Sequence, residues 1–226
     1  MKAACIPDIV ESCYTCPWRA ESFFCHLSTE DFSAWADVTI PSIRLPEATL
    51  FIEGQRSREV FHICYGRVIL TRADGDRTLI VRIVEAGEIL GIAEAFTSGV
   101  HRHTATALDP SHVRVMENSA FIQFFQKSKG VCRSIVQQFG RTVDVAERLR
   151  FVSAQPTAAA RLAHLLLYFA ETQGKVGEDG TRVTPFLSHK EIGQILACSR
   201  ETVTRMLGRM KRRGLITIAG ASITIV

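Results

Sequence analysis

Two short helices separated by a turn of about three residues constrain the fold of this chain more than any other feature. The first is predicted to begin after Ser188, because Ser188 and Glu191 have the spacing of a capping box. Ser199 can cap the second helix. Its apolar positions recur at helical spacing, at Val203, Met206, Leu207 and Met210. Two helices joined in this way form a helix-turn-helix motif.

The same stretch carries a local excess of positive charge. Residues 186–215 hold seven lysines and arginines against two glutamates, whereas the whole chain has a net charge of only +4. A basic patch confined to one short segment favours a polyanionic partner. Lysine and arginine near the end of the second helix also suit the helix dipole, so that part of the charge has a structural explanation as well.

Residues in the first turn of the second helix have the chemistry needed to read bases. In a helix-turn-helix, this turn enters the major groove of DNA. Arg200 and Arg205 can each donate two hydrogen bonds to guanine, and Glu201 can accept one from the amino group of cytosine. We therefore predict that Arg200, Glu201 and Arg205 contact bases in double-stranded DNA.

The remaining sequence divides into three zones ahead of a DNA-binding domain at residues 154–226. Residues 1–27 form a cysteine-rich segment. Residues 28–118 are predicted to be a small antiparallel β-roll, because β-branched runs flank an "ADGD" hairpin turn and glycines recur at turn-like intervals. Residues 119–153 are predicted to be helical, so the fold class is α+β.

The long helical stretch has an apolar seam that could pair with a second copy of the chain. The seam residues that fall on heptad positions are Val131, Ile135, Val145, Leu149 and Val152. Gln138 and Thr142 interrupt this pattern, which is compatible with a switchable dimer. The alternative is that the seam packs on the chain's own β-domain.

Cysteine spacing indicates a metal or redox site at the N-terminus. Of the seven cysteines, four lie in the first 25 residues: Cys5, Cys13, Cys16 and Cys25. Four thiolates suffice for a [4Fe–4S] cluster or for tetrahedral zinc. Reversible thiol–disulfide chemistry is a further alternative.

The stretch "SHKEIGQILACSRETVTRMLGRMKRRGLI" resembles the winged helix-turn-helix of the CRP/FNR family of transcription regulators, and the resemblance extends over residues 28–226. It implies a cyclic-nucleotide-binding-like jelly roll, a dimerisation helix, a homodimer on a palindromic TGTGA-like site, and contact with RNA polymerase. It also implies DNA-backbone or flanking contacts from Ser188, His189, Lys190, Ser199 and Thr202.

The resemblance also bears on what the roll senses. Family members that bind cyclic AMP have Gly-Glu-Leu where this chain has Gly91-Ile92-Ala93, and Arg-Ser where it has Arg102-His103. These differences disfavour cyclic nucleotide binding. It stays, together with haem in the roll, the alternative to a sensor at the N-terminal cysteines.

Oxygen-sensing members of the family carry an N-terminal cysteine group. They take a fourth ligand from the position of Arg114, which is not a cysteine here. We expect an iron–sulfur cluster held by Cys5, Cys13, Cys16 and Cys25, with Cys64 and Cys132 as alternatives for the fourth ligand. Oxygen or nitric oxide would destroy the cluster and loosen the dimer.

The sequence gives little support to an enzyme. No Ser-His-Asp elbow, P-loop or His-Glu-x-x-His motif is present. The longest apolar runs are too short to span a bilayer, and the N-terminus has no signal-peptide pattern. We therefore expect a cytoplasmic protein that does not associate with membranes.

Overall fold

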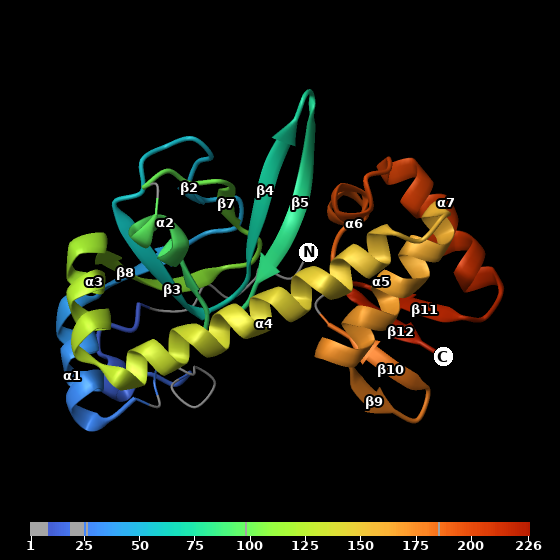
Figure 1. The fold of residues 1–226 in the computed structure, drawn as a ribbon. Helices are drawn as coiled ribbons and strands as arrows, with labels where there is room; N and C mark the ends of the chain where they lie inside the picture. Colours follow the sequence, from blue (N-terminus) through green and yellow to red (C-terminus); the bar gives the residue numbers. More distant parts are fainter. Residues whose placement is uncertain (1–8, 19–24, 26, 98, 185) are drawn as a thin grey trace. The chain divides into compact units, whose positions relative to one another are not determined.

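The computed structural model describes residues 9–18, 25, 27–97, 99–184 and 186–226. The chain divides into two compact units, residues 1–141 and residues 142–226 (Figure 1). In the described residues, no helix combines the length and the apolar character needed to cross a membrane.

The first unit contains two four-stranded sheets in which all neighbouring strands are antiparallel. One sheet has the order β1 (Ile40–Arg44), β8 (Ser111–Glu117), β3 (Glu59–Tyr65) and β6 (Ile89–Leu90). The other has the order β2 (Thr49–Phe51), β7 (Thr104–Ala107), β4 (Val68–Asp74) and β5 (Arg77–Val84). Apolar side chains from both sheets form one buried cluster, so the predicted β-roll is confirmed.

Glycines turn the chain where the sequence predicted them to. Strands β4 and β5 form a hairpin in which Asp74 pairs with Arg77 across Gly75 and Asp76, and Gly75 has a φ of 58°. At Gly91 the φ is 87°, and a Cβ atom would lie 2.8 Å from the carbonyl oxygen of Glu59. Only glycine satisfies both conditions at this position.

Helices occur where the sequence predicted strands. Helix α1 (Thr29–Val38) precedes the roll, and the short α2 (Ile92–Phe96) interrupts it. The predicted stretch 119–152 is two helices, α3 (Asn118–Lys127) and α4 (Lys129–Ser153). The break follows from Ser128, whose hydroxyl accepts a hydrogen bond from the Val131 N–H at 3.1 Å and donates one to Asp31 at 2.6 Å.

A second buried cluster lies outside the roll's internal core. It joins Val60, Ile89 and Met116 of the first sheet to Phe32 and Trp35 of α1, to Phe121 and Phe124 of α3, and to Val131 and Ile135 of α4. Cys13 and Cys25 of the N-terminal segment belong to the same cluster. The cysteine segment therefore packs into the layer between the sheet and the helices, and Cys13 opens a short 3₁₀ helix, η1 (Cys13–Thr15).

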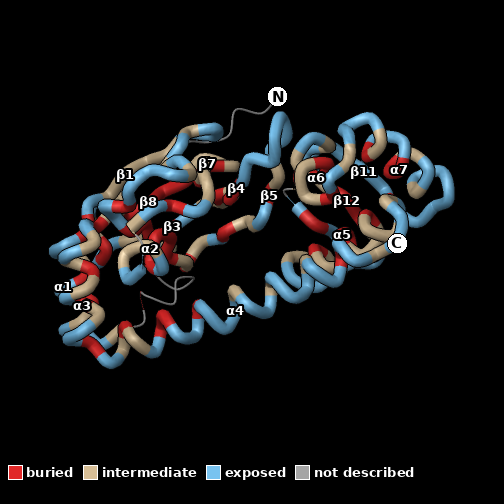
Figure 2. The backbone as a smooth tube through the Cα atoms, turned by 45° about the horizontal axis from the view of Figure 1, so that its top comes forward, coloured by how far each residue is buried: buried red, intermediate tan, exposed pale blue. Residues whose placement is uncertain are grey.

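Three of the five residues predicted for the dimer seam on α4 are buried within the protein itself: Val131, Ile135 and Val152. Val131 and Ile135 are 0% and 3% exposed because they pack on the chain's own roll. Gln138 does not interrupt a dimer seam, because its side chain accepts a hydrogen bond from the Ile89 N–H and donates one to the Ile89 carbonyl. Figure 2 shows buried and exposed positions alternating along α4.

The second unit combines helices with a four-stranded sheet of order β11-β12-β10-β9. Its elements are α5 (Ala158–Gln173), β9 (Lys175–Gly177), β10 (Gly180–Val183), α6 (His189–Leu196), α7 (Arg200–Arg212), β11 (Ile216–Ala219) and β12 (Ser222–Ile225). The predicted helix-turn-helix is confirmed, and the strands β11 and β12 follow it. After α5 the chain forms the β9-β10 hairpin.

Replacing Gln138 by leucine should destabilise the first unit. Gln138→Leu removes both hydrogen bonds to Ile89 and leaves a buried N–H and carbonyl without them, which costs about 1–3 kcal/mol. Urea unfolding of the variant would measure this loss. Gln137→Leu is the matched control, because Gln137 is exposed on the same turn. Equal unfolding midpoints for the two variants would contradict the assigned role.

Candidate functional site

Local hydrogen bonds fix the two helices of the helix-turn-helix. The Ser188 hydroxyl accepts from the Glu191 N–H, and the Glu191 carboxylate accepts from the Ser188 N–H, which confirms the capping box. The turn passes through Ala197 in the left-handed conformation, with a φ of 51°. Ser199 caps α7 by accepting from the Thr202 N–H at 3.2 Å. Side chains at the start of each helix thus accept hydrogen bonds from backbone N–H groups of its first turn.

Helix α7 buries one face and exposes the residues predicted to read bases. Val203, Met206 and Leu207 are buried in the second unit. Arg200, Glu201, Thr204 and Arg205 are exposed. Within the described residues, neither arginine forms an ion pair. These side chains are therefore available to a partner.

Hydrogen bonds in the first turn of α7 favour the ionised form of the Glu201 side chain. Hydrogen bonds from its own backbone N–H and from the Ser199 hydroxyl lower the pKa of Glu201. An ionised carboxylate can only accept hydrogen bonds, as contact with a cytosine amino group requires.

Side chains predicted to contact the DNA backbone lie at the starts of α6 and α7. Ser188, Ser199 and Thr202 take part in the capping bonds. The imidazole Nδ1 of His189 lies 2.8 Å from the Thr204 hydroxyl, which links α6 to α7. Lys190 is exposed. The structure thus gathers all five predicted residues at the N-terminal ends of the two helices.

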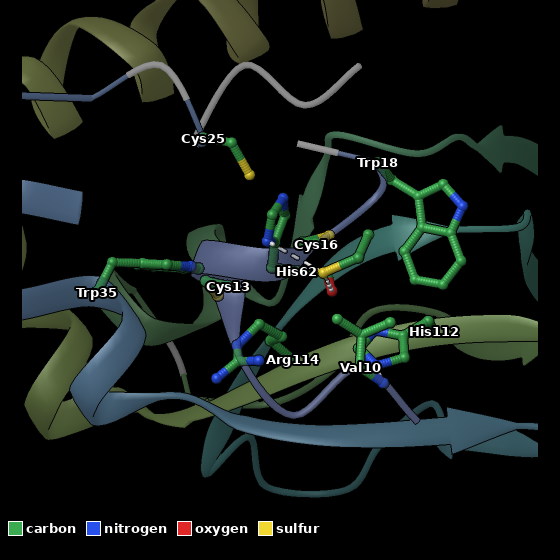
Figure 3. A pocket seen from close by; sticks show the side chains of 10 residues that line it. Val10, Cys13, Cys16, Trp18, Cys25, Trp35, His62, His112 and Arg114 are labelled. Carbon is green, nitrogen blue, oxygen red and sulfur yellow. Dashed lines mark hydrogen bonds between the residues drawn. The ribbon is translucent and has the colours of Figure 1, made fainter. Parts of the chain in front are cut away.

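A second candidate site is a cavity of about 10 Å³ in the first unit, enough for roughly one water molecule. In Figure 3, Cys13 and Cys16 lie beside the imidazole of His62, with Cys25 above the ring and Arg114 below it. The lining residues are Val10, Cys13, Cys16, Trp18, Cys25, Trp35, His62, Cys64, His112 and Arg114. Four of the chain's seven cysteines therefore line one cavity.

Strand alternation explains which residues the roll contributes to this cavity. Successive side chains of a strand point to opposite faces, so His62 and Cys64 of β3 share the face opposite to Phe61 and Ile63. On β8, which pairs with β3, Arg114 lies opposite His62. Because Phe61 and Ile63 belong to the core between the sheets, His62 and Cys64 face the cysteine segment.

Arg114 is buried, with 5% of its surface exposed. Its guanidinium donates to the Thr39 hydroxyl at 2.7 Å and to the carbonyl oxygens of Thr39, Ala36 and Glu11 at 3.0, 3.4 and 3.1 Å. All of these acceptors are neutral. Among the described residues, no carboxylate forms an ion pair with this side chain. A buried cation thus lies at the cavity with only dipolar partners.

The neighbouring titratable groups do not add positive charge. Burial, followed by the charges of Arg114 and His112, lowers the pKa of His62 to about 3. Burial and Arg114 also lower the pKa of His112, whose Nε2 accepts a hydrogen bond from the Val10 N–H. Both imidazoles are therefore neutral near pH 7, and Arg114 supplies the positive charge at the cavity.

Three of the four predicted ligands, Cys13, Cys16 and Cys25, are brought together in the cavity. Cys5 lies outside the described residues. Cys64 joins the other three, although the sequence analysis ranked it behind Cys5. The signal that could have found it is the alternation of β3 and β8, which places His62, Cys64, His112 and Arg114 on one face.

The spacing of these side chains limits what they can hold. No three histidine, cysteine, aspartate or glutamate side chains in the described ranges are close enough to hold a single metal ion as they stand. A tetrahedral zinc site brings four sulfurs within about 2.3 Å of one ion. Thiol sulfur is the donor type that both tetrahedral zinc and iron–sulfur clusters use.

The positions that correspond to a nucleotide-binding cassette differ in character. Ile92 is 4% exposed and belongs to the buried cluster between sheet and helices. Arg102 is on the surface. The neighbouring His101 is buried and stacks on Phe51, with ring centroids 3.9 Å apart. The apolar side chain of Ile92 thus occupies the position at which a cyclic nucleotide would need a carboxylate to bind its ribose.

Comparison with known proteins covers both units. A Crp-like helix-turn-helix domain model matches residues 160–226, and a cyclic nucleotide-binding domain model matches residues 45–128. The chain is similar to the cAMP-activated global transcriptional regulator CRP of Salmonella typhimurium, with 25% identity over 182 residues, or 79% of this chain and 86% of that protein.

Solved structures share the fold. A CooA mutant from Carboxydothermus hydrogenoformans has a TM-score of 0.77 at 20% identity, and the match covers 90% of this chain and 91% of that chain. The c-di-GMP responsive global regulator CLP of Xanthomonas campestris has a TM-score of 0.75 at 17% identity, with 88% and 99% covered. At these identities the likeness establishes the fold of both units.

Proposed function

Since the chain belongs to the CRP/FNR family of transcription regulators, we propose that it is a homodimeric DNA-binding regulator controlled by an iron–sulfur cluster at its N-terminal cysteines. One observation carries the sensory part of this proposal. Cys13, Cys16 and Cys25 meet Cys64 around a single cavity beside a buried arginine.

Exposure on α7 supports sequence-specific DNA binding. Arg200, Glu201 and Arg205 project from a face that the unit does not bury. A TGTGA-like half-site offers guanines for the arginines and a cytosine on the complementary strand for the glutamate. The operator would be a palindrome of two such half-sites about one DNA turn apart.

An exposed apolar stripe on α4 supports the homodimer. Val136, Phe139 and Val143 recur at alternating spacings of three and four residues and are 67%, 43% and 55% exposed. This is the period of a coiled-coil seam. At 100° per residue, the centre of the stripe lies roughly a quarter of a turn around the helix from Val131 and Ile135, which pack on the roll. The stripe takes the place of the seam predicted from the sequence.

Charge and ligand chemistry support a cluster in the cavity. A [4Fe–4S] cluster bound by four thiolates carries net negative charge, and Arg114 would balance part of it. The cavity of about 10 Å³ is smaller than a cluster, so the cysteine segment would have to shift outward when one binds. Iron and sulfide would give the site its reactivity toward oxygen, nitric oxide or redox state.

The cysteines are connected to the dimer helix through shared packing. Cys13 and Cys25 belong to the same buried cluster as Val131 and Ile135 of α4. Loss of the cluster would disturb this packing and the orientation of α4. We propose that the signal reaches the DNA-binding helices in this way. RNA polymerase would be the partner that reads the result.

A ligand-sensing regulator is the second candidate. The cyclic nucleotide-binding domain model matches the roll, which is the observation that favours it. The buried Ile92 and the exposed Arg102 count against a cyclic nucleotide. Haem in the roll, zinc and thiol redox chemistry remain outcomes that the spectrum and metal content below would identify.

Truncating Arg205 should weaken DNA binding and relax its specificity. Arg205→Ala removes a two-pronged donor, which should cost about 1–3 kcal/mol of affinity for a TGTGA palindrome. Fluorescence anisotropy with matched and single-base-substituted duplexes measures both effects. Arg72→Ala is the control, since Arg72 lies on the β4-β5 hairpin. Unchanged discrimination between the duplexes would exclude base reading by Arg205.

A charge on the α4 stripe should dissociate the dimer. Val136→Glu places a carboxylate in the apolar seam, and two copies would meet across it. Analytical ultracentrifugation should show a shift from dimer to monomer, with weaker binding to the palindrome. Gln137→Glu adds the same charge beside the stripe and should leave the dimer intact. A dimeric Val136→Glu variant would place the interface elsewhere.

Anaerobic purification tests the cluster itself. We expect a brown protein with about four iron and four sulfide per chain and a broad absorption band that air or nitric oxide bleaches. Binding to the palindrome should change when the band is lost. A sharp Soret band would indicate haem. Protein without iron after anaerobic reconstitution with iron and sulfide would exclude the cluster and leave the DNA-binding assignment intact.

A further inference from the structure

Cys64 has an environment that a purely structural cysteine does not need. It is 7% exposed and sits on β3, which is buried on both faces. Its Sγ lies 3.6 Å from Nδ1 of His62, which shares its face of the strand. Cys13, Cys16 and Cys25 line the same cavity. Four thiols are therefore gathered at one site.

Arg114 lines the same cavity and is buried. A guanidinium buried without a carboxylate is unfavourable unless other charge compensates it. Thiolates at Cys13, Cys16, Cys25 and Cys64 would provide that negative charge, and iron would hold them deprotonated.

We propose that Cys64 of β3 is the fourth ligand of the cluster, with Arg114 as its buried counter-charge. This inference rests on the proposed iron–sulfur function and deepens it. Three ligands would come from the N-terminal segment and one from the roll. When iron binds, each thiol sulfur forms one bond to iron and releases its proton to solvent. The iron and sulfide come from outside the protein.

The cysteines of α4 and of the DNA-binding unit fit this role less well. Cys132 of α4 donates to the Phe125 carbonyl at 3.1 Å and does not line the cavity. Cys198 lies in the second unit, in the turn of the helix-turn-helix. Cys5 lies outside the described residues and enters the test as the competing ligand.

The position of Cys64 also ties the N-terminal segment to a fixed element. Apart from the thiols, that segment meets the roll through the Val10 N–H on His112, the Glu11 carbonyl on Arg114, and the Trp18 ring stacked 4.9 Å from Tyr65. These contacts lie next to Cys64, because Tyr65 follows it on β3 and His112 of β8 pairs with Tyr65. A cluster ligand at Cys64 would attach the N-terminal segment to the roll beside the contacts that the segment already makes.

Cluster content of single cysteine variants tests the assignment. Wild type, Cys64→Ala, Cys5→Ala and Cys132→Ala would be reconstituted anaerobically with iron and sulfide and compared by iron and sulfide content and by visible absorption. We expect Cys64→Ala to lose most of its iron, while Cys5→Ala and Cys132→Ala match wild type. Far-UV circular dichroism and the urea unfolding midpoint check that each variant is folded.

A conservative variant guards against loss of the cluster through misfolding. Cys64→Ser offers an oxygen ligand in place of sulfur, and Mössbauer spectra of protein reconstituted with ⁵⁷Fe should show one iron site of about four altered. Four unaltered sites in Cys64→Ser, or full iron in Cys64→Ala with loss in Cys5→Ala, would overturn the proposal and leave the cluster function standing. A wild type that binds no iron would overturn both.

Discussion

The hydrogen bonds of the buried Arg114 guanidinium are the interaction on which the first unit depends. The guanidinium holds together three parts of the chain that are far apart in sequence: the segment at Glu11, the C-terminal end of α1 at Ala36 and Thr39, and strand β8. Neutral carbonyl and hydroxyl groups satisfy its hydrogen bonds but do not neutralise its charge. The positive charge of Arg114 consequently favours negative charge in the cavity beside it.

The packing around this cavity determines which parts of the first unit a structural change there would disturb. The layer between the first sheet and the helices includes the cysteine segment, α1, α3 and the start of α4 in one continuous cluster. The core between the two sheets is separate from it. Under the proposed function, a perturbation near the cysteines would act on the helices and leave the inner core of the roll intact, as switching without unfolding requires.

Local patterns in the sequence predicted the fold well where one interaction dominates. The capping box at Ser188 and Glu191, the cap at Ser199 and the glycine turn at Gly75 depend on neighbours within three residues, and all are confirmed. The seam on α4 was assigned wrongly because an apolar residue such as Ile135 can face the roll or a partner with the same periodicity. Only tertiary packing distinguishes the two.

The candidate site at the cysteines likewise depends in part on tertiary packing. Spacing alone identified Cys13, Cys16 and Cys25, because they are close in sequence. Cys64 depends on the pairing of β3 with β8 and on α1, which the sequence analysis did not predict. The residues that we propose to read bases could be selected from the sequence because a single helix, α7, presents them on one side.

The division of the four thiols between the N-terminal segment and β3 has a consequence for chain entropy. A cluster bound to Cys13 and Cys64 would cross-link positions roughly 50 residues apart, and closing a loop of that length in the unfolded chain corresponds to about 4 kcal/mol. The cluster would then act as a removable staple. Its loss would return that conformational freedom to the N-terminal segment without breaking any covalent bond of the polypeptide.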